Sequence, residues 1–246
     1  MSYLGYTRHI VDGYLSRISH PRILEIGVDN GQTTLPLIHN LSMVHGEQGT
    51  GNGFIYVGVD IKMRETFMEQ VCQMTGIWCK NEGTIAQPKA TDGVVLLYEN
   101  NSLDILGGWN PELKFDLVMI DGDHNYHTVK NELKLLQTCT KPTTVFLCDD
   151  FDGRYAREDL WYSEKEEYAD NEMATTRVET EKSGVRDAIL DFCKEDENDW
   201  QVWCKPGLDA CLMWKPKFIN LAFTAETPET LFPNWKLNFS LVNPEE

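Results

Sequence analysis

Short apolar runs alternate along this chain with segments in which apolar residues recur at helical spacing. Such runs, without polar alternation, are typical of strands buried on both faces of a sheet. Strands that alternate with helices predict a mostly parallel, doubly wound α/β sheet. The strands are expected at residues 22–27, 54–60, 93–98, 115–121 and 143–148, and the helices at 5–18, 33–41, 63–76, from 126 onwards, and around 185–192.

The end of the chain departs from this alternation. Two short apolar runs, 200–204 and 210–214, are joined across Pro206 and Gly207 and predict a β-hairpin. The hairpin would complete a seven-stranded sheet with an antiparallel edge, in one domain over residues 1–216. Residues 154–182 form a polar insertion after the fifth strand. Residues 217–246 form a tail that packs on the domain or on an oligomer partner, and the sequence leaves both open.

The charge of the chain limits its partners. The formal net charge is −17, and we find no basic patch that would bind the phosphates of a nucleic acid or an anionic membrane. No apolar run approaches the ~20 residues that span a bilayer, and the first residues do not resemble a signal peptide. The seven cysteines contain no CxxC pair. We therefore expect a cytoplasmic protein with reduced thiols that acts on a small molecule.

Much of the acid lies in one block. Residues 151–200 hold 16 acidic and 7 basic residues. Within the insertion, Tyr155, Trp161, Tyr162 and Tyr168 stand among these acids. Because the insertion follows the end of a strand, it can form a lid or a substrate wall, and its aromatic faces would suit sugar rings. A disordered acidic loop is the alternative.

Polar residues follow every predicted parallel strand at its carboxyl end, where ligands bind in sheets of this kind. The first strand is followed by glycines that let the backbone approach a ligand. The motif lacks the second glycine of a dinucleotide fingerprint and has an acid there, which would repel a pyrophosphate. The polar residues and glycines are Glu25, Gly27, Asp29 and Gly31, then Asp60, then Asn100, Asn101 and Ser102, then Asp121, Asp123 and His124, then Asp149 and Asp150.

The pattern E-x-G-x-x-x-G after the first strand, with an acid ending the second, resembles the class I S-adenosylmethionine-dependent methyltransferases. The resemblance implies that Gly27 and Gly31 pass close to the methionine part of S-adenosylmethionine, with Glu25 holding the loop. It implies that Asp60 accepts hydrogen bonds from the ribose hydroxyls and that Asn101 or Ser102 lies near the adenine. Asp29, Thr33 and Asp121 complete the predicted cofactor site, with Thr33 also a helix cap.

Three acids and a histidine form a second predicted site. Asp121, Asp149 and Asp150 end two neighbouring strands, and three carboxylates at one point repel one another unless a cation or protons intervene. Mg²⁺ or another divalent cation suits such oxygen ligands. His124 can take a proton from a substrate hydroxyl, with His127 as the competing base. The alternative is that the paired acids only cap a loop and Asp121 only touches the cofactor.

These residues resemble the metal-dependent O-methyltransferases. Catechol-type enzymes have a Lys where this chain has His124 and an Asn where it has Asp150. The string I-D-G-D-H-x-Y, residues 120–126, is closer to the macrocin-type sugar O-methyltransferases. The resemblance implies transfer of a methyl group to a hydroxyl of a sugar or glycosylated metabolite. A metal-independent methyltransferase and a non-catalytic methyltransferase-like binding module are the alternatives.

Overall fold

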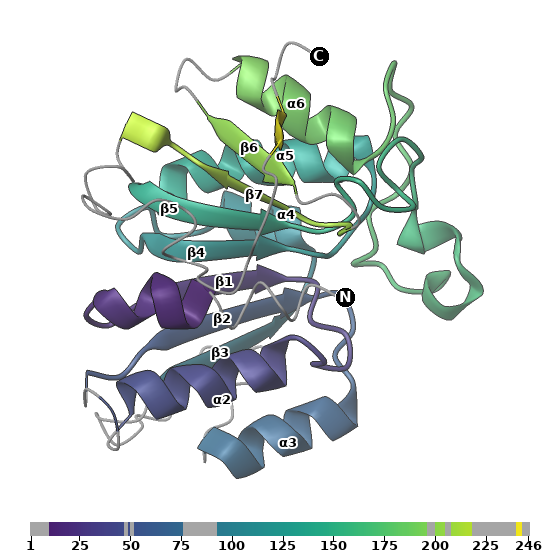
Figure 1. Cartoon of the computed structure of the whole chain (residues 1–246). Coiled ribbons are helices and arrows are strands. Elements are labelled where there is room, and N and C mark those ends of the chain that lie inside the picture. Colours follow the sequence, from purple (N-terminus) through teal and green to yellow (C-terminus); the bar gives the residue numbers. More distant parts are fainter. Residues whose placement is uncertain are drawn as a thin grey trace.

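The computed structural model describes residues 10–46, 49, 52–75, 93–195, 200–204, 208–217 and 240–242. One mixed sheet runs through it in the order β3-β2-β1-β4-β5-β7-β6-β8 (Figure 1). The strands β1 to β5 are parallel, whereas β7, β6 and β8 pair antiparallel. The strands are β1 (Arg22–Ile26), β2 (Ile55–Asp60), β3 (Val94–Glu99), β4 (Phe115–Ile120), β5 (Thr140–Cys148), β6 (Gln201–Cys204), β7 (Cys211–Trp214) and β8 (Ser240–Val242).

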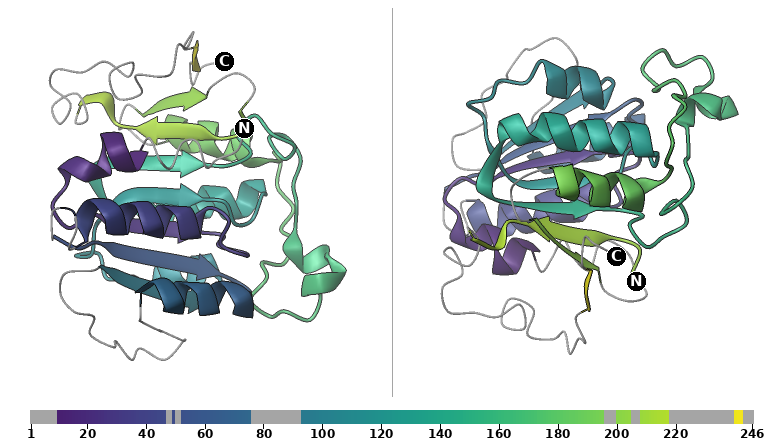
Figure 2. Two further views of the ribbon diagram at one scale, coloured as in Figure 1. Left: turned by 60° about the horizontal axis from the view of Figure 1, so that its bottom comes forward. Right: turned by 90° about the horizontal axis from the view of Figure 1, so that it is seen from above.

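Helices cover both faces of the sheet (Figure 2). The sheet therefore divides the hydrophobic core into two clusters, one on each face. On one face, Leu37, Leu41 and Phe67 pack from α2 and α3 against β1 and β2. On the other, Leu133 and Ile189 pack from α5 and α6 against β4 and β5. Five of the helices are α2 (Thr34–His45), α3 (Glu65–Thr75), α4 (Ser102–Gly107), α5 (Tyr126–Leu136) and α6 (Val185–Glu195).

The predicted doubly wound fold is confirmed, including its antiparallel hairpin. The structure adds an eighth strand, β8, which pairs with β6, and a short helix, α4, that the periodicity did not predict. At six residues, α4 is too short to show a helical repeat, and Asn101 caps it by accepting a hydrogen bond from the N–H of Leu103. The predicted first helix is helical at residues 10–13 and continues as a 3₁₀ turn at Leu15–Arg17. Its residues 5–9 lie outside the described part of the chain.

Two boundaries also differ from the prediction. The helix α2 continues to His45, beyond the predicted end at residue 41. The strand β5 begins at Thr140, and its pairing with β4 is irregular between Phe115 and Leu117. Among the helices that the structure describes, none has the length and apolar character needed to cross a bilayer.

Candidate active site

A cavity of about 390 Å³ opens at the carboxyl edge of the parallel strands. The loops after β1 to β4 form one wall, and residues 162–175 supply side chains to the other. Its charged lining consists of six carboxylates and two basic side chains, Arg64 and Lys165, together with His124. Most of the predicted site residues line this cavity: Glu25, Gly27, Asp29, Thr33, Asp60, Asn101, Ser102, Asp121 and His124.

The glycine loop after β1 approaches the end of β4 closely. Gly27 has a φ of +87°, and a Cβ built on it would lie 2.0 Å from the carbonyl oxygen of Asp121. No other residue type fits here without moving β4. Gly31 also has a positive φ, of +76°, but its hydrogen atoms face the ring of Phe67, and it does not line the cavity. Gly31 therefore packs against α3, and its contact with the cofactor stays a prediction.

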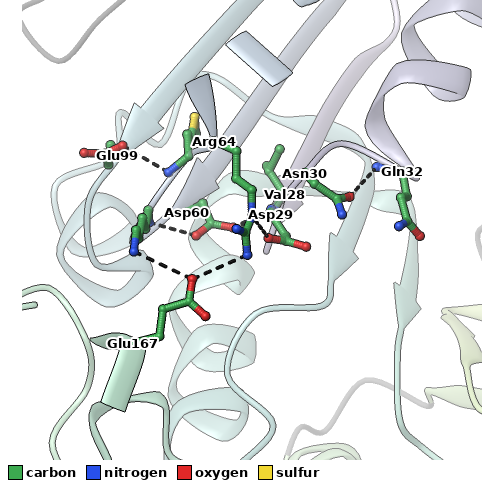
Figure 3. A network of polar contacts seen from close by, with 10 residues as sticks. Val28, Asp29, Asn30, Gln32, Asp60, Arg64, Glu99 and Glu167 are labelled. Carbon is green, nitrogen blue, oxygen red and sulfur yellow. Dashed lines mark hydrogen bonds and ion pairs between the residues drawn. The ribbon is translucent and has the colours of Figure 1, made fainter. Parts of the chain in front are cut away.

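Asp60 fastens this loop to the end of β2 (Figure 3). Its Oδ2 accepts hydrogen bonds of 2.7 Å from the N–H groups of both Val28 and Asp29. Its Oδ1 accepts a third, of 2.9 Å, from the N–H of Lys62. Burial raises the pKa of Asp60 in spite of these three donors. The residue predicted to contact the ribose therefore also fixes the shape of the glycine loop.

Glu25 lies beneath the loop, buried in β1. Its Oε2 accepts a hydrogen bond of 2.8 Å from Thr34 and another from the hydroxyl of Tyr56. Burial raises the pKa of Glu25 to about 7. Thr33 precedes α2 and makes no side-chain cap, so the predicted capping role is not observed and its neighbour Thr34 bonds to Glu25 instead.

Asn101 and Ser102 connect the end of β3 to other parts of the site. The side-chain amide of Asn101 donates to the carbonyl oxygen of Met173, at 2.8 Å, and to the hydroxyl of Thr175, at 3.1 Å. The hydroxyl of Ser102 donates to Oε1 of Glu132 at 2.6 Å. Glu132 is buried on α5, and burial raises its pKa to about 8. Sequence reasoning missed Glu132, because its position on α5 gives no sign of what it faces.

Two of the three predicted metal-binding acids meet at one point. Ligand atoms of Asp121, Asp149 and His124 all lie within 4.8 Å of one another. Burial, and then the charge of Asp149, raise the pKa of Asp121 well above its ordinary value. Two carboxylates this close favour a bound cation or a shared proton. The two carboxylates thus fit a divalent cation, and His124 lies beside them.

Asp150 is turned toward the imidazole of His124 instead. Its Oδ2 lies 3.1 Å from Nδ1 of His124. Although burial acts in the opposite direction, the hydrogen bond and charge of His124 lower the pKa of Asp150, as do backbone donors at Tyr155 and Arg154. Asp150 has a φ of +53°, which Asp adopts more readily than most residues. The sequence-based assignment of Asp150 as a metal ligand stays a prediction.

His124 is buried, and its Nε2 lies 3.8 Å from Oδ1 of Asp121. The competing base, His127, does not line the cavity. Its ring contacts that of Trp161, with the ring centres 6.4 Å apart, and its carbonyl accepts a hydrogen bond from Asn131. Of the two histidines, the structure brings only His124 to the acids.

The acidic insertion lies beyond the carboxyl ends of the strands, where it closes one side of the cavity (Figure 2). The structure describes all of residues 154–182 as an ordered segment, in contrast to the alternative of a disordered loop. Glu167 is 3.4 Å from Arg64 and 3.7 Å from Lys62, while Arg64 also pairs with Asp29 (Figure 3). Asn171 donates to the carbonyl oxygen of Ile61 at 2.9 Å. These contacts attach the insertion to the loops around Asp29 and Asp60.

Sequence reasoning located the insertion but not the side chains that enter the cavity. The aromatic residues were the available signal: of the four predicted to form the wall, Tyr162 and Tyr168 line the cavity, whereas Tyr155 and Trp161 do not. The lining residues from this segment are Tyr162, Lys165, Glu167, Tyr168 and Thr175.

The sequence of residues 24–151 matches the family described as methyltransferase domain. The chain belongs to this family. It is an S-adenosylmethionine-dependent methyltransferase of class I, as the glycine motif, the acid after β2 and the strand order indicate. The methyltransferase has no match among curated proteins.

The chain is similar to solved methyltransferase structures at low sequence identity. CalS11, a TDP-rhamnose 3'-O-methyltransferase of calicheamicin biosynthesis, is 14% identical with a TM-score of 0.51, and the alignment covers 86% of this chain and 78% of that chain. An O-methyltransferase from Bacillus cereus is 15% identical with a TM-score of 0.46, covering 87% and 80%. At 14% identity, the likeness to CalS11 extends to the fold alone.

Proposed function

We propose that this methyltransferase transfers a methyl group to a hydroxyl of a small polyhydroxylated acceptor, a sugar or glycosylated metabolite, with the help of a divalent cation such as Mg²⁺. The observation that carries the proposal is the contact between His124 and Asp150 beside the carboxylates of Asp121 and Asp149. Asp121 and His124 line the same cavity as Asp60 and the glycine loop, which supports a base next to a cation site at this point.

Asp121 and Asp149 are the proposed ligands of the cation. Mg²⁺ is commonly held by one or two carboxylates and keeps its other positions for water and substrate oxygens. A cation would also remove the repulsion that raises the pKa of Asp121. When bound, S-adenosylmethionine supplies an electrophilic methyl group, and the cation lowers the pKa of a hydroxyl that it contacts.

His124 is the proposed base. Its Nδ1–H donates to Asp150, and this leaves the lone pair on Nε2 as the acceptor of a proton. Asp150 fixes the orientation of the ring and stabilises the imidazolium that forms when the proton arrives, as carboxylates beside histidines do in other enzymes. The hydroxyl of the acceptor would thus lose its proton at Nε2, 3.8 Å from Asp121.

Aromatic rings in the cavity support a sugar-like acceptor. Tyr162 and Tyr168 line the cavity, and the ring centre of Tyr162 lies 6.4 Å from that of His124. Aromatic faces pack on the C–H groups of sugar rings, and the neighbouring acids accept hydrogen bonds from hydroxyls. The net charge of −17 and the carboxylates of the cavity disfavour a nucleic acid as acceptor.

Chelation tests the metal, and an acceptor panel tests the substrate class. The protein is treated with EDTA, then assayed with S-adenosylmethionine against sugars, glycosides and catechols, with and without added Mg²⁺ or Mn²⁺. We expect turnover on a glycoside that disappears with the cation and returns with it. Turnover unchanged by chelation would contradict the metal, and cofactor binding without turnover on any acceptor would favour a binding module.

Direct cation binding gives a readout that does not depend on activity. Mn²⁺ titration followed by electron paramagnetic resonance is expected to show weaker binding in Asp149→Asn. Asp152→Asn is the matched control, because the carboxylate of Asp152 pairs with Arg186 outside the cavity. Equal Mn²⁺ affinity in the two variants would contradict the proposed cation site.

A further inference from the structure

The insertion presents an aromatic ring to the cavity at a defined place. Tyr162 begins the 3₁₀ turn Tyr162–Glu164, directly after Trp161, which is buried. The carbonyl oxygen of Tyr162 accepts a hydrogen bond of 2.9 Å from the N–H of Lys165, and Ser163 donates to the carbonyl oxygen of Thr175 at 2.8 Å. A buried anchor and two hydrogen bonds therefore hold the ring where it lines the cavity.

The ring of Tyr162 lies between the two ends of the cavity. At one end its centre is 6.4 Å from the centre of His124. Burial, and then the charges of Asp121, Tyr168, Asp123 and Asp60, raise the pKa of its hydroxyl. At the other end the ring of Tyr162 contacts that of Tyr168, with the ring centres 5.1 Å apart. The ring of Tyr168 lies 5.5 Å from the ammonium of Lys62, whose backbone N–H donates to Asp60.

The sulfur of the cofactor is expected in the same part of the cavity, between His124 and Asp60. In the proposed reaction the ribose lies near Asp60, and the methyl group lies between the sulfur and the hydroxyl whose proton His124 takes. The sulfur, which carries a positive charge in S-adenosylmethionine and none in the product S-adenosylhomocysteine, must therefore lie between these two ends. Tyr162 flanks that stretch of the cavity.

The face of this ring already attracts a cation. The ammonium of Lys165 lies 5.0 Å from the centre of the Tyr162 ring, within the range of a cation–π interaction. Tyr168 contacts Tyr162 edge to face at 5.1 Å, so the ring is held in its orientation. An electron-rich face in a cavity lined by six carboxylates against two basic side chains, Arg64 and Lys165, favours a positively charged ligand over a neutral one.

We infer that Tyr162 binds the sulfonium of the cofactor through its aromatic face and so distinguishes S-adenosylmethionine from S-adenosylhomocysteine. The inference rests on the proposed function. It assigns the insertion a role in holding the cofactor, in addition to any contact with the acceptor. Because the contact weakens when the methyl group leaves, it favours exchange of the product for a new cofactor molecule.

Calorimetric titration of both cofactor forms tests this inference. Tyr162→Leu is expected to weaken binding of S-adenosylmethionine roughly 3- to 30-fold more than binding of S-adenosylhomocysteine, the range of a cation–π contact. Tyr162→Phe is expected to stay within about twofold of the native ratio, because it keeps an aromatic face. Tyr155→Leu is the matched control for cofactor affinity, since Tyr155 contacts His124 but does not line the cavity.

A fluorinated series keeps the test valid if Tyr162→Leu does not fold. Phenylalanines with increasing fluorine content at position 162 keep the shape of the ring and weaken its negative face stepwise. We expect a stepwise loss of S-adenosylmethionine affinity and constant S-adenosylhomocysteine affinity. Equal losses for both ligands, or a Phe variant that behaves like Leu, would overturn the inference alone. Native protein that binds neither ligand would overturn the proposed function as well.

Discussion

The imidazole of His124 and the carboxylate of Asp150 lie 3.1 Å apart, from Nδ1 to Oδ2. Asp150 sits in the left-handed region, and a Cβ at Gly153 would come within 2.0 Å of its Oδ1. The left-handed backbone at Asp150 and the absence of a side chain at Gly153 leave room for the carboxylate beside the histidine. Asp150 thus orients the proposed base.

Asp150→Asn tests this role while keeping the backbone, because Asn tolerates a positive φ. We expect kcat to fall by about 10²- to 10³-fold, since an amide cannot stabilise the imidazolium, with cofactor affinity unchanged. Stopped assays and calorimetry measure the two quantities. If Asp150→Asn loses Mn²⁺ binding as fully as Asp149→Asn, Asp150 is a ligand, as the sequence predicted.

Asp60→Asn is expected to weaken cofactor binding by about 10- to 100-fold, because an amide offers one acceptor where Asp60 uses two oxygens for three N–H groups. The loss of a loop bond should also lower the free energy of unfolding by about 1–3 kcal/mol. Calorimetry and urea denaturation measure these effects. Asp104→Asn, at an exposed carboxylate on α4, is the control. Unaltered affinity would contradict the role of Asp60 at the ribose and in the loop.

The contact of Glu167 with Arg64 and Lys62 is expected to slow cofactor release. All three side chains are about half exposed, so each ion pair is weak. Glu167→Gln should speed dissociation of S-adenosylhomocysteine by about 2- to 5-fold at low ionic strength. At about 1 M salt the difference should vanish, because the Debye length falls to about 3 Å. Glu166→Gln, on the same turn, is the control, and equal rates in both variants at low salt would refute the idea.

Glu132 makes stability depend on pH. Its pKa is about 8 in the folded state against an ordinary value of 4.5, so the folded protein keeps a proton that the unfolded chain releases. Between these two pH values, the folded state should therefore lose about 1.4 kcal/mol per pH unit from this group. The loss begins near the unfolded pKa and is complete near the folded one.

Glu132→Gln removes the titration and keeps an acceptor for Ser102. We compare the free energies of unfolding of Glu132→Gln and of the native protein, measured by urea denaturation. Apart from a constant offset, the two should be equal near pH 4, the variant should become increasingly more stable up to about pH 8, and the difference should stay level above it. The contribution of Glu25, whose pKa is also raised, cancels in the comparison with native protein. A difference that does not change with pH would contradict the assignment.

The sequence predicted well which edge of the sheet carries the cavity. The carboxyl ends of parallel strands meet at one edge, independently of how the helices pack. Glu25, Gly27, Asp60 and Asp121 lie where the alternation of strands and helices put them. Gly31 lies outside the lining of the cavity, because its positive φ brings it against Phe67. A glycine motif indicates the conformation of the backbone but not which atoms lie opposite each glycine.

By itself, the sequence determined the α/β class, the order of the candidate site residues along the chain and the acids at the strand ends. All of these follow from local periodicity and from the polarity of loops. Only the tertiary structure decided which residues meet. It turned Asp150 to His124, moved His127 away from the acids, and brought Tyr162 and Glu167 from the insertion to His124 and Arg64. Some of these contacts join residues that are far apart in the chain, and others depend on how packing directs a side chain. Neither kind of contact produces a periodic pattern in the sequence.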